Sequence, residues 1–285
     1  MLQAAGPLGQ VISAVLEQGK ERLSEELTDA NSLILLQRVA FFDTRVNKLD
    51  EGGKKALLNW ARGTSLGQPA DLVAAVSGRR AKALRALAGA AAGAASYLRL
   101  RAEPEWRLVV GLGNKANPHE IGLALHGTYG WPVIPGSALK GLAAAWASSP
   151  ESGADPGDVR RVFGGPRPGE RITKAMPAAR GTVRFLDAIP DGEPASVVID
   201  VMTPHVKPYY DRLAAGADFL PPAEYHNPVP LAFLTVRGGF AVDLYGSSDK
   251  DVEHAAEWLI AAGDELGAGA KTAAGYGYLA MERKP

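Results

Sequence analysis

The chain has 285 residues, a formal net charge of zero, 46% hydrophobic residues and no cysteine. This length allows one large or two medium-sized domains, and the absence of cysteine excludes disulfides, thiolate metal sites and a cysteine nucleophile. Because the net charge is zero, a polyanion would have to be bound by local basic patches rather than by the field of the whole molecule.

Charged residues are unevenly distributed along the chain. Residues 159–186 carry seven Lys and Arg against Glu170 alone, residues 72–102 carry six basic residues and no acidic one, and residues 187–265 are acidic. Each cluster fits either a binding face or the ordinary solvated face of a helix. The first fourteen residues lack the basic start of a signal peptide, and Ala86–Leu98 is too short to span a membrane, so we expect a cytoplasmic protein.

The first hundred residues are expected to be helical. Apolar residues recur at helical spacing over 8–27, and further helices are predicted over 31–42, 54–60 and 79–100. Glu103-Pro104 then marks a change to short β-rich runs separated by Gly and Pro. We therefore expect an N-terminal helical region over 1–104 and a second domain over 105–285.

The second domain is predicted to start with a strand over 106–113. Pro135-Gly-Ser137 then opens a helix whose apolar stripe leaves Lys140 in the first turn, where the helix dipole disfavours a cation. A bound anion would resolve this conflict, with Ser137 as the N-cap. Alternatively, Lys140 is simply solvated, at a cost of only about 0.3 to 1 kcal/mol.

Further strands are predicted over 181–189, 196–202, 231–236 and 240–245, with Arg237-Gly-Gly239 as a hairpin turn between the last two. Ser248 and Asp251 form a possible capping box for a following helix, and a final strand is predicted over 276–281. The order of strand, helix, strands, helix and strand is that of an α+β, ferredoxin-like βαββαβ unit with insertions.

Four glycines, Lys271 and Thr272 lie between the last predicted helix and strand, in the segment Leu266–Tyr278. Glycine allows positive φ and brings backbone N–H groups close to a ligand, so the segment fits an anion-binding loop. A Walker A loop is excluded because Ala270 precedes the lysine, and a dinucleotide fingerprint is excluded because its third glycine would fall at Thr272. The plain alternative is a surface turn.

Three motifs in order, Ile134-Pro-Gly-Ser-Ala-Leu-Lys-Gly141, Asp200-Val-Met-Thr-Pro-His205 and Lys271-Thr-Ala-Ala-Gly-Tyr-Gly277, resemble the RAMP superfamily of CRISPR effector proteins. The similarity covers about residues 105–282 and is greatest to the sixth-subunit family of type III-B Cmr complexes. It implies an RRM-like subunit that assembles around CRISPR RNA, and it does not explain the N-terminal hundred residues.

The resemblance implies a non-catalytic subunit that contacts the backbone of guide and target RNA and caps the subunit filament in antiviral defence. The implied partners are CRISPR RNA, target RNA, other Cmr-type RAMP subunits and the small subunit, with no cofactor, metal or membrane. The residues expected to contact RNA come from the three motifs: Ser137, Lys140, Gly141, His205, Gly267, Gly269, Lys271, Thr272, Gly275 and Gly277.

Other functions stay open at this point. His205, with Lys207 and two tyrosines, Tyr209 and Tyr210, could form a metal-independent endoribonuclease site, although no spacing fixes their geometry. The family's cleaving subunit uses an acidic residue after the first strand, where this chain offers only Glu120. The protein could also be a scaffold that binds only other proteins.

Two further groups of side chains have two interpretations each. Three carboxylates, Asp187, Asp191 and Asp200, could hold Mg²⁺ across adjacent strands, but Asp191-Gly192 is more simply a turn. The aromatic residues of the proline-rich insertion could stack on bases, bind a neighbouring subunit or close a small core; they are Tyr209, Tyr210, Phe219 and Tyr225.

Overall fold

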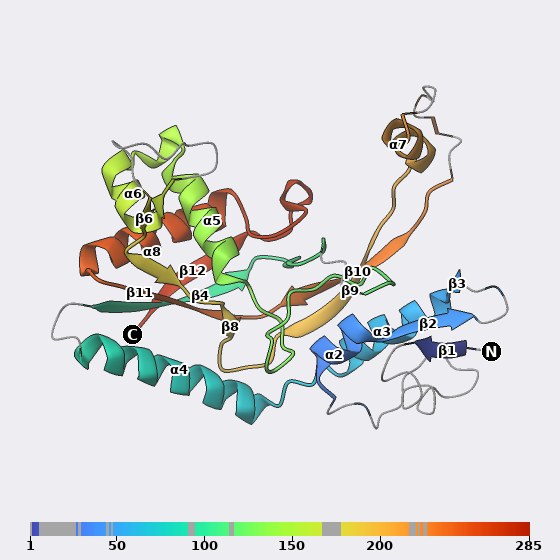
Figure 1. Ribbon diagram of the computed structural model, residues 1–285, viewed down its shortest axis with the longest axis horizontal. Coiled ribbons are helices and arrows are strands. Elements are labelled where there is room, and N and C mark those ends of the chain that lie inside the picture. Colours follow the sequence, from blue (N-terminus) through green and yellow to red (C-terminus); the bar gives the residue numbers. More distant parts are fainter. Residues whose placement is uncertain are drawn as a thin grey trace.

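A computed structural model of the chain shows its fold (Figure 1). The structure describes residues 2–5, 27, 30–43, 46, 48–90, 95–113, 117–166, 178–216, 221, 223–224 and 227–285. Nearly all of the helix expected over 8–27 falls outside these residues, as do Arg167, Arg171 and Lys174 of the basic segment and two of the four aromatic residues, Phe219 and Tyr225. None of the described helices is long and apolar enough to cross a membrane.

The centre of the molecule is an antiparallel sheet in the order β12-β4-β11-β7, and β8 also pairs with β11. In chain order these four strands are β4, β7, β11 and β12, so across the sheet they run fourth, first, third, second. Helix α5 follows the first of them and α8 follows the third. This is the α+β ferredoxin-like arrangement that the sequence predicts. The elements are β4 (Ser96–Pro104), α5 (Gly136–Ala147), β7 (Val183–Phe185), β8 (Ile189–Pro190), β11 (Phe240–Gly246), α8 (Asp249–Glu265) and β12 (Leu279–Lys284).

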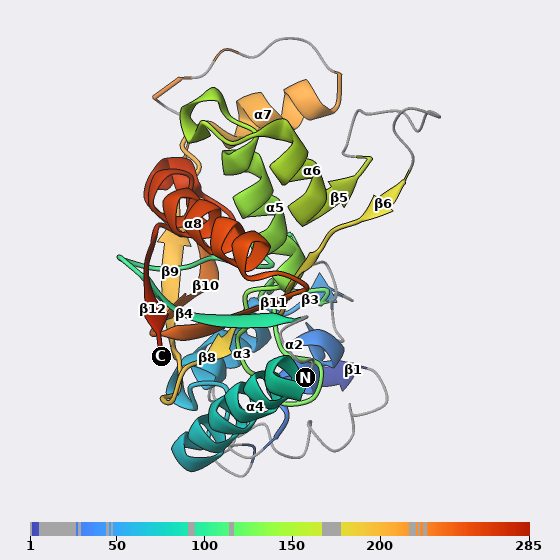
Figure 2. The same cartoon turned by 90° about the vertical axis from the view of Figure 1, so that its left-hand side faces the viewer.

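Helices cover both faces of this sheet (Figure 2). On one face α5 packs against α8, and the Ser248 hydroxyl accepts a hydrogen bond from the Asp251 N–H at 3.2 Å, which confirms the predicted cap. On the other face α4 (Ala70–Ala90) lies along β4 and β11. Smaller elements flank α5: η2 (Pro150–Ser152), α6 (Pro156–Phe163), β5 (Gly164–Gly165) and β6 (Ala179–Arg180).

The boundary between α4 and β4 differs from the prediction. The expected helix over 79–100 ends at Ala90, and its last residues are the beginning of β4. From Tyr97 to Ala102 large apolar and basic residues alternate, a period of two that fits a strand with one face on the α5 and α8 layer. Because the stretch before it is rich in alanine, the sequence pattern did not indicate where the helix ends and the strand begins.

The segment predicted as the first strand, 106–113, makes only isolated bridges, from Leu108 to Val236 and from Val109 to Gly269. A domain division at residue 104 therefore assigns β4 to the N-terminal region, although β4 pairs with β11 and β12. We propose that the second domain begins before Ser96.

The N-terminal region is not purely helical. A small antiparallel sheet accompanies its helices, and the expected helix over 31–42 ends at Arg38 because Val39-Ala-Phe-Phe42 favours extended structure. The elements are β1 (Leu2–Ala5), α2 (Ser32–Arg38), β2 (Ala40–Asp43), β3 (Lys48–Leu49) and α3 (Glu51–Gly63). Helix α3 packs on β9, which joins this region to the rest of the protein.

A two-stranded antiparallel arm projects from the molecule between β8 and β11 (Figure 1). It consists of β9 (Ser196–Met202) and β10 (Leu231–Arg237), with α7 (Lys207–Ala214) beyond the strand ends. The expected hairpin at Arg237-Gly-Gly239 is wrong: β10 pairs with β9 and β11 pairs with β4, so the turn joins two sheets.

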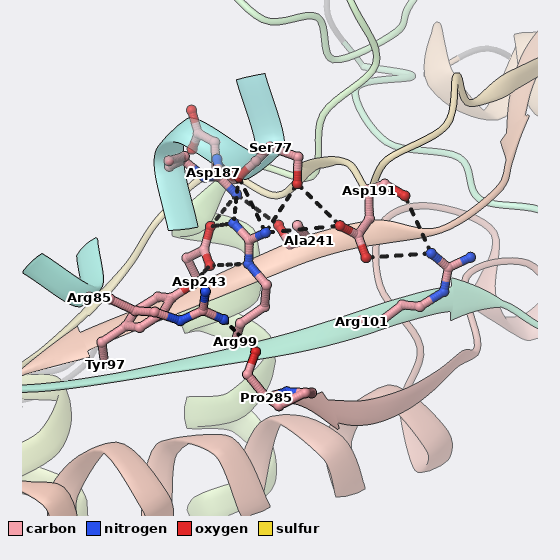
Figure 3. A network of polar contacts seen from close by, with 11 residues as sticks. Ser77, Arg85, Tyr97, Arg99, Arg101, Asp187, Asp191, Ala241, Asp243 and Pro285 are labelled. Carbon is pink, nitrogen blue, oxygen red and sulfur yellow. Dashed lines mark hydrogen bonds and ion pairs between the residues drawn. The ribbon is translucent and has the colours of Figure 1, made fainter. Parts of the chain in front are cut away.

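A buried polar network fastens α4 to the sheet (Figure 3). Asp243 on β11 lies opposite Arg99 on β4, binds its Nε at 2.7 Å, and also binds Nη2 of Arg80 from α4 at 2.5 Å. Tyr97 also donates a hydrogen bond to this carboxylate at 2.7 Å. Burial alone would raise the pKa of Asp243, but the hydrogen bonds and the two guanidinium charges outweigh it, so this pKa lies below its ordinary value.

The N-terminal region is attached to the loop before α5 by buried polar contacts. The Asn117 side chain donates to the Val39 carbonyl at 2.8 Å, and Nε2 of His119 accepts the Phe41 N–H at 2.9 Å. This acceptor must be unprotonated. Burial, with the charge of Lys54 as a second cause, lowers the pKa of His119 below its ordinary value of 6.5.

Replacing Asp243 by Asn should lower the free energy of unfolding by about 3 to 5 kcal/mol, because Arg99 and Arg80 would keep buried charges without a carboxylate. Chemical denaturation measures this. The matched control Asp264→Asn, at an exposed position of α8, should change the free energy by less than about 0.5 kcal/mol. Similar small effects for both variants would show that the network does not fasten the helix.

The free energy of unfolding should decrease as the pH falls from 6.5, because the unfolded chain takes up a proton at His119 that the folded chain resists. The stabilisation that unprotonated His119 contributes is fully present above pH 6.5. It is lost as the pH falls toward the lowered pKa of the folded state. His119→Gln, which keeps an acceptor that does not titrate, should flatten this slope in denaturation curves. The control His205→Gln, at an exposed ring, should leave it unchanged; an equal slope in wild type and His119→Gln would refute the assignment.

Candidate functional site

The glycine loop, residues 266–278, joins α8 to β12 and is held at its base by backbone hydrogen bonds. The N–H groups of Ala268, Ala270 and Gly277 donate to the carbonyls of Gly277, Val109 and Arg107 at 2.7, 2.7 and 2.8 Å. The irregular segment 107–110 thus lies against the loop, and Leu108 bridges to β10 on its other side. The loop is built into the core at both ends.

The four loop glycines have different roles. Gly277 has φ of +83° and is buried, and an added Cβ would lie 2.0 Å from the Ala268 carbonyl oxygen. Gly269, at φ +87°, leaves room for the Val109 carbonyl in the same way, and Gly267 is buried at φ +71°. Gly275 has φ of +86° with open space around it. Gly267, Gly269 and Gly277 therefore serve the packing of the loop, and of the four glycines only Gly275 lies on an open outer turn.

The outer turn contains the short 3₁₀ helix η3 (Thr272–Ala274), and Ala273, Ala274 and Gly275 are exposed. Among the described residues, no acceptor is hydrogen-bonded to the backbone N–H groups of Lys271, Thr272 or Ala273. Successive free N–H groups beside a left-handed residue form a concave donor surface that suits an anion. Of the loop residues expected to bind an anion, Lys271, Thr272 and Gly275 lie on this outer turn.

Lys271 has φ of +64°, which is unusual for a residue with a side chain. Its Nζ lies 5.0 Å from the Phe233 ring centroid and 3.2 Å from the Met202 sulfur. Within the described part of the chain it has no carboxylate partner. Its charge lies over Phe233 and Met202 of the arm.

A polar contact behind the loop joins the glycine loop, the arm and the segment after β4. Asp200 of β9 accepts a hydrogen bond from the Tyr276 hydroxyl at 2.8 Å and pairs with Arg107. Burial would raise the pKa of Asp200, but the Tyr276, Val201 and Arg107 bonds outweigh it and lower this pKa, whereas burial and Asp200 raise the pKa of Tyr276 to about 12. The Asp200 motif and the glycine loop are thus brought together, as a positioning contact.

The start of α5, where an anion site was predicted, has a different structure from the one expected. Pro135 is the N-cap and makes no side-chain cap bond, so Ser137 does not cap the helix. The Gly136 N–H instead donates to the Asp187 carboxylate at 2.7 Å, and that carboxylate occupies the helix end where an anion was expected. Ser137 and Gly141 are exposed and Lys140 is half-buried, and no described contact joins them to the glycine loop.

His205 is exposed on the arm beyond β9. Lys207 is paired with Asp211 at 2.5 Å, and the Tyr209 and Tyr210 rings contact each other edge to face with centroids 5.2 Å apart. Among the described residues, no contact joins His205 to any of the three, so the structure does not show these side chains as a hydrogen-bonded group. Tyr210 is 57% exposed, and α7 buries no residue, so this aromatic residue does not close a small core.

The three aspartates proposed for Mg²⁺ are held by different partners. Asp187 accepts from Gly136, Asp191 pairs with Arg101 at 3.4 Å, and Asp200 accepts from Tyr276. Among the described residues, no cluster of three His, Asp or Glu side chains could hold a metal. In the basic segment 159–186, Arg161 is already neutralised by Asp158 and Asp251.

The structure adds a pocket of about 260 Å³ between the loop, the arm and α3 that the sequence did not indicate. Two lysines, Lys54 and Lys271, reach it from segments more than two hundred residues apart. Lys54 belongs to no motif, so only the tertiary fold reveals it. The full lining is Lys54, Leu112, Gly113, Glu120, Met202, Leu231, Ala232, Phe233 and Lys271.

The chain is similar in sequence to known proteins. A sequence model of the RAMP superfamily matches residues 93–280, a range that contains β4 and all three motifs. The chain is 30% identical over 222 residues to the "CRISPR system Cmr subunit Cmr6" of Pyrococcus furiosus, which covers 61% of this chain and 64% of that protein. The match thus spans slightly less than two thirds of that relative's length.

Two solved structures are also similar. A chain in the cryo-EM structure of the type III-B Cmr-beta complex bound to cognate target RNA has 19% identity and a TM-score of 0.51, over 73% of this chain and 66% of that one. The crystal structure of Cmr6 from Pyrococcus furiosus has 27% identity and a TM-score of 0.35, over 66% of this chain and 99% of that one. The first likeness shows a shared fold.

Three Gly→Ala substitutions test the different glycine roles. Gly277→Ala should cost about 3 kcal/mol or more, because a positive φ and a backbone clash add up. Gly275→Ala should cost about 1 to 2 kcal/mol, from φ alone. Gly141→Ala, at an open position inside α5, should stabilise the protein by about 0.5 to 1 kcal/mol. Chemical denaturation gives the order, and equal effects at Gly275 and Gly277 would contradict it.

Proposed function

The chain belongs to the RAMP superfamily, and on this premise we propose that it is a non-catalytic RNA-binding and assembly subunit of a type III-B Cmr ribonucleoprotein. It contacts the backbone of guide or guide-target RNA and caps the subunit filament in antiviral defence. The capping role rests on the similarity to the Cmr6 sequence, and the partners are CRISPR RNA, target RNA, other Cmr-type RAMP subunits and the small subunit.

The observation that carries the proposal is the outer turn of the glycine loop. It is exposed, offers unbonded N–H groups at Lys271, Thr272 and Ala273, and has in Lys271 a cation without a carboxylate partner in the described part of the chain. These groups suit phosphodiester oxygens, and they read no base sequence. Phosphate contacts of this kind position a strand whatever its sequence, which suits a subunit that must accept many guides.

The support for RNA contact is weaker at the other expected positions. Gly267 and Gly277 are buried and serve the loop's packing, and the helix start at Ser137 faces the Asp187 carboxylate. We retain Ser137, Lys140 and Gly141 as candidate contacts because they are accessible or partly so, and His205 because it is exposed on the arm. We propose the outer turn of the glycine loop as the main RNA contact, ahead of these four residues.

The arm supports the assembly part of the proposal. Large apolar residues are exposed along it. Val201 is 53% exposed and Leu213 is 63% exposed. Apolar groups gathered on a projecting element are typical of protein contacts. Tyr210 and Val229 are further exposed apolar or aromatic residues of the same insertion. A neighbouring subunit seated there would remove them from water.

Lys271→Gly should lower the affinity of the full chain for a short unstructured RNA about tenfold, by removing one charged contact. It should also reduce the slope of log affinity against log salt by about 0.7. Glycine suits the positive φ at this position, so the variant should fold at least as well as the wild type. Fluorescence anisotropy over a salt series makes the measurement.

Lys82→Ala is the matched control, since it removes an exposed lysine from α4. It should leave both affinity and slope near the wild-type values. Unchanged binding by Lys271→Gly would count against the loop as the RNA contact. Purifying the tagged full chain from its own host tests the assembly role, and recovery without RAMP subunits or CRISPR RNA would contradict it.

A further inference from the structure

The pocket between α3, the arm and the glycine loop is a composite of the N-terminal region and the RAMP domain. Lys54 comes from α3, Met202 and Phe233 from the arm, and Lys271 from the loop. We propose that this pocket binds a single nucleotide of the RNA strand that crosses the glycine loop. Lys54 and Lys271 contact its phosphodiester, and the apolar wall holds its base. This inference rests on the proposed RNA-binding function and assigns a direct role to the N-terminal region.

Charge is the first argument for an anionic ligand. Two lysines converge on one hollow, and among the described residues neither forms an ion pair. Lys54 is half-buried, so part of its side chain is already removed from water. Like charges in such a place repel each other, and a bound anion removes the repulsion.

The pocket also limits how much negative charge it accepts. Glu120 lines it as the one acidic residue, so the formal charge of the three ionisable groups is +1. A phosphodiester carries one negative charge, whereas a free phosphate carries nearly two. The balance therefore favours a phosphate within a strand. The Glu120 carboxylate can accept from a ribose 2′-hydroxyl or an exocyclic amine next to that phosphate.

The remaining wall is apolar and aromatic. Leu112, Met202 and Leu231 line it, and the Phe233 ring lies beneath the Lys271 ammonium at 5.0 Å. At about 260 Å³ the pocket is slightly smaller than sites for drug-sized ligands. It has room for one base with its sugar, and unpaired bases commonly bind against such apolar and aromatic surfaces.

Backbone conformation is an independent argument. Four non-glycine residues with positive φ occur in the described part of the chain, and two of them, Glu120 at +56° and Lys271 at +64°, line this pocket. Such conformations persist where the surroundings fix them, and they cluster at binding sites. The turn at Glu120 is fixed by its N–H bond to the Asn117 carbonyl at 2.9 Å, and Asn117 is in turn bonded to Val39.

Lys54→Ala should weaken binding of a fluorescein-labelled, unstructured RNA by the full chain about tenfold, and lower the salt slope by about 0.7. The matched control is Lys55→Ala, one residue along α3 and exposed away from the pocket lining; it should leave affinity near wild type. Leu231→Asp places a negative charge at the pocket's exposed rim and should weaken binding at least as much as Lys54→Ala. Thermal unfolding of each variant checks that it folds.

The outcomes separate this inference from the proposed function. If Lys271→Gly weakens RNA binding while Lys54→Ala and Leu231→Asp bind like the wild type, the loop contacts RNA and the pocket inference is overturned. If none of the three changes affinity, both fail. Equal weakening by Lys54→Ala and Lys55→Ala would show a general charge effect and would also overturn the pocket.

Discussion

The hydrogen bond from Tyr276 to Asp200, with Arg107 as the second partner of the carboxylate, is the contact on which the candidate site depends. It joins the end of the glycine loop to the arm, and the backbone bonds of Val109 and Arg107 join both to the segment after β4. Since the inner loop is held by these contacts and by Gly269 and Gly277, its outer turn is presented as a defined shape. A preorganised turn does not have to be ordered when a ligand binds.

The position of α4 decides which surface is left for a nucleic acid. RRM-like modules commonly bind RNA on the open face of their sheet. Here α4 lies on that face, and the Asp243, Arg99 and Arg80 network fastens it over β4 and β11 (Figures 2 and 3). With α5 and α8 on the opposite face, both faces of the sheet are covered. The loop at the end of the sheet and the neighbouring arm are left uncovered by these helices, and this is why we propose them as the contact surface.

Much of the fold follows from local sequence. Ser248 and Asp251 predict the α8 cap, and β-branched runs predict β9, β10 and β11, because these signals depend on neighbouring residues only. The α4 to β4 boundary was missed because the alanine-rich helix runs almost into a strand whose alternation is short. The pairing partners of β10 and β11 were also missed, because a Gly-Gly turn between two strands does not say whether they share a sheet.

The candidate site was only partly predictable for the same reason. The glycine loop can be recognised in the sequence. Which glycines pack and which face solvent depends on Val109, which is distant in sequence, and on Ala268, which lies across the turn. The contact of Asp187 with the start of α5, and the presence of Lys54 and Lys271 in one pocket, bring together residues far apart in the chain that no spacing encodes. Ultraviolet crosslinking of bound RNA to the full chain, read by mass spectrometry, tests the central claim most directly. We predict adducts on the outer turn at residues 271–275; adducts confined to α4 or α5, with none on that turn, would contradict the account.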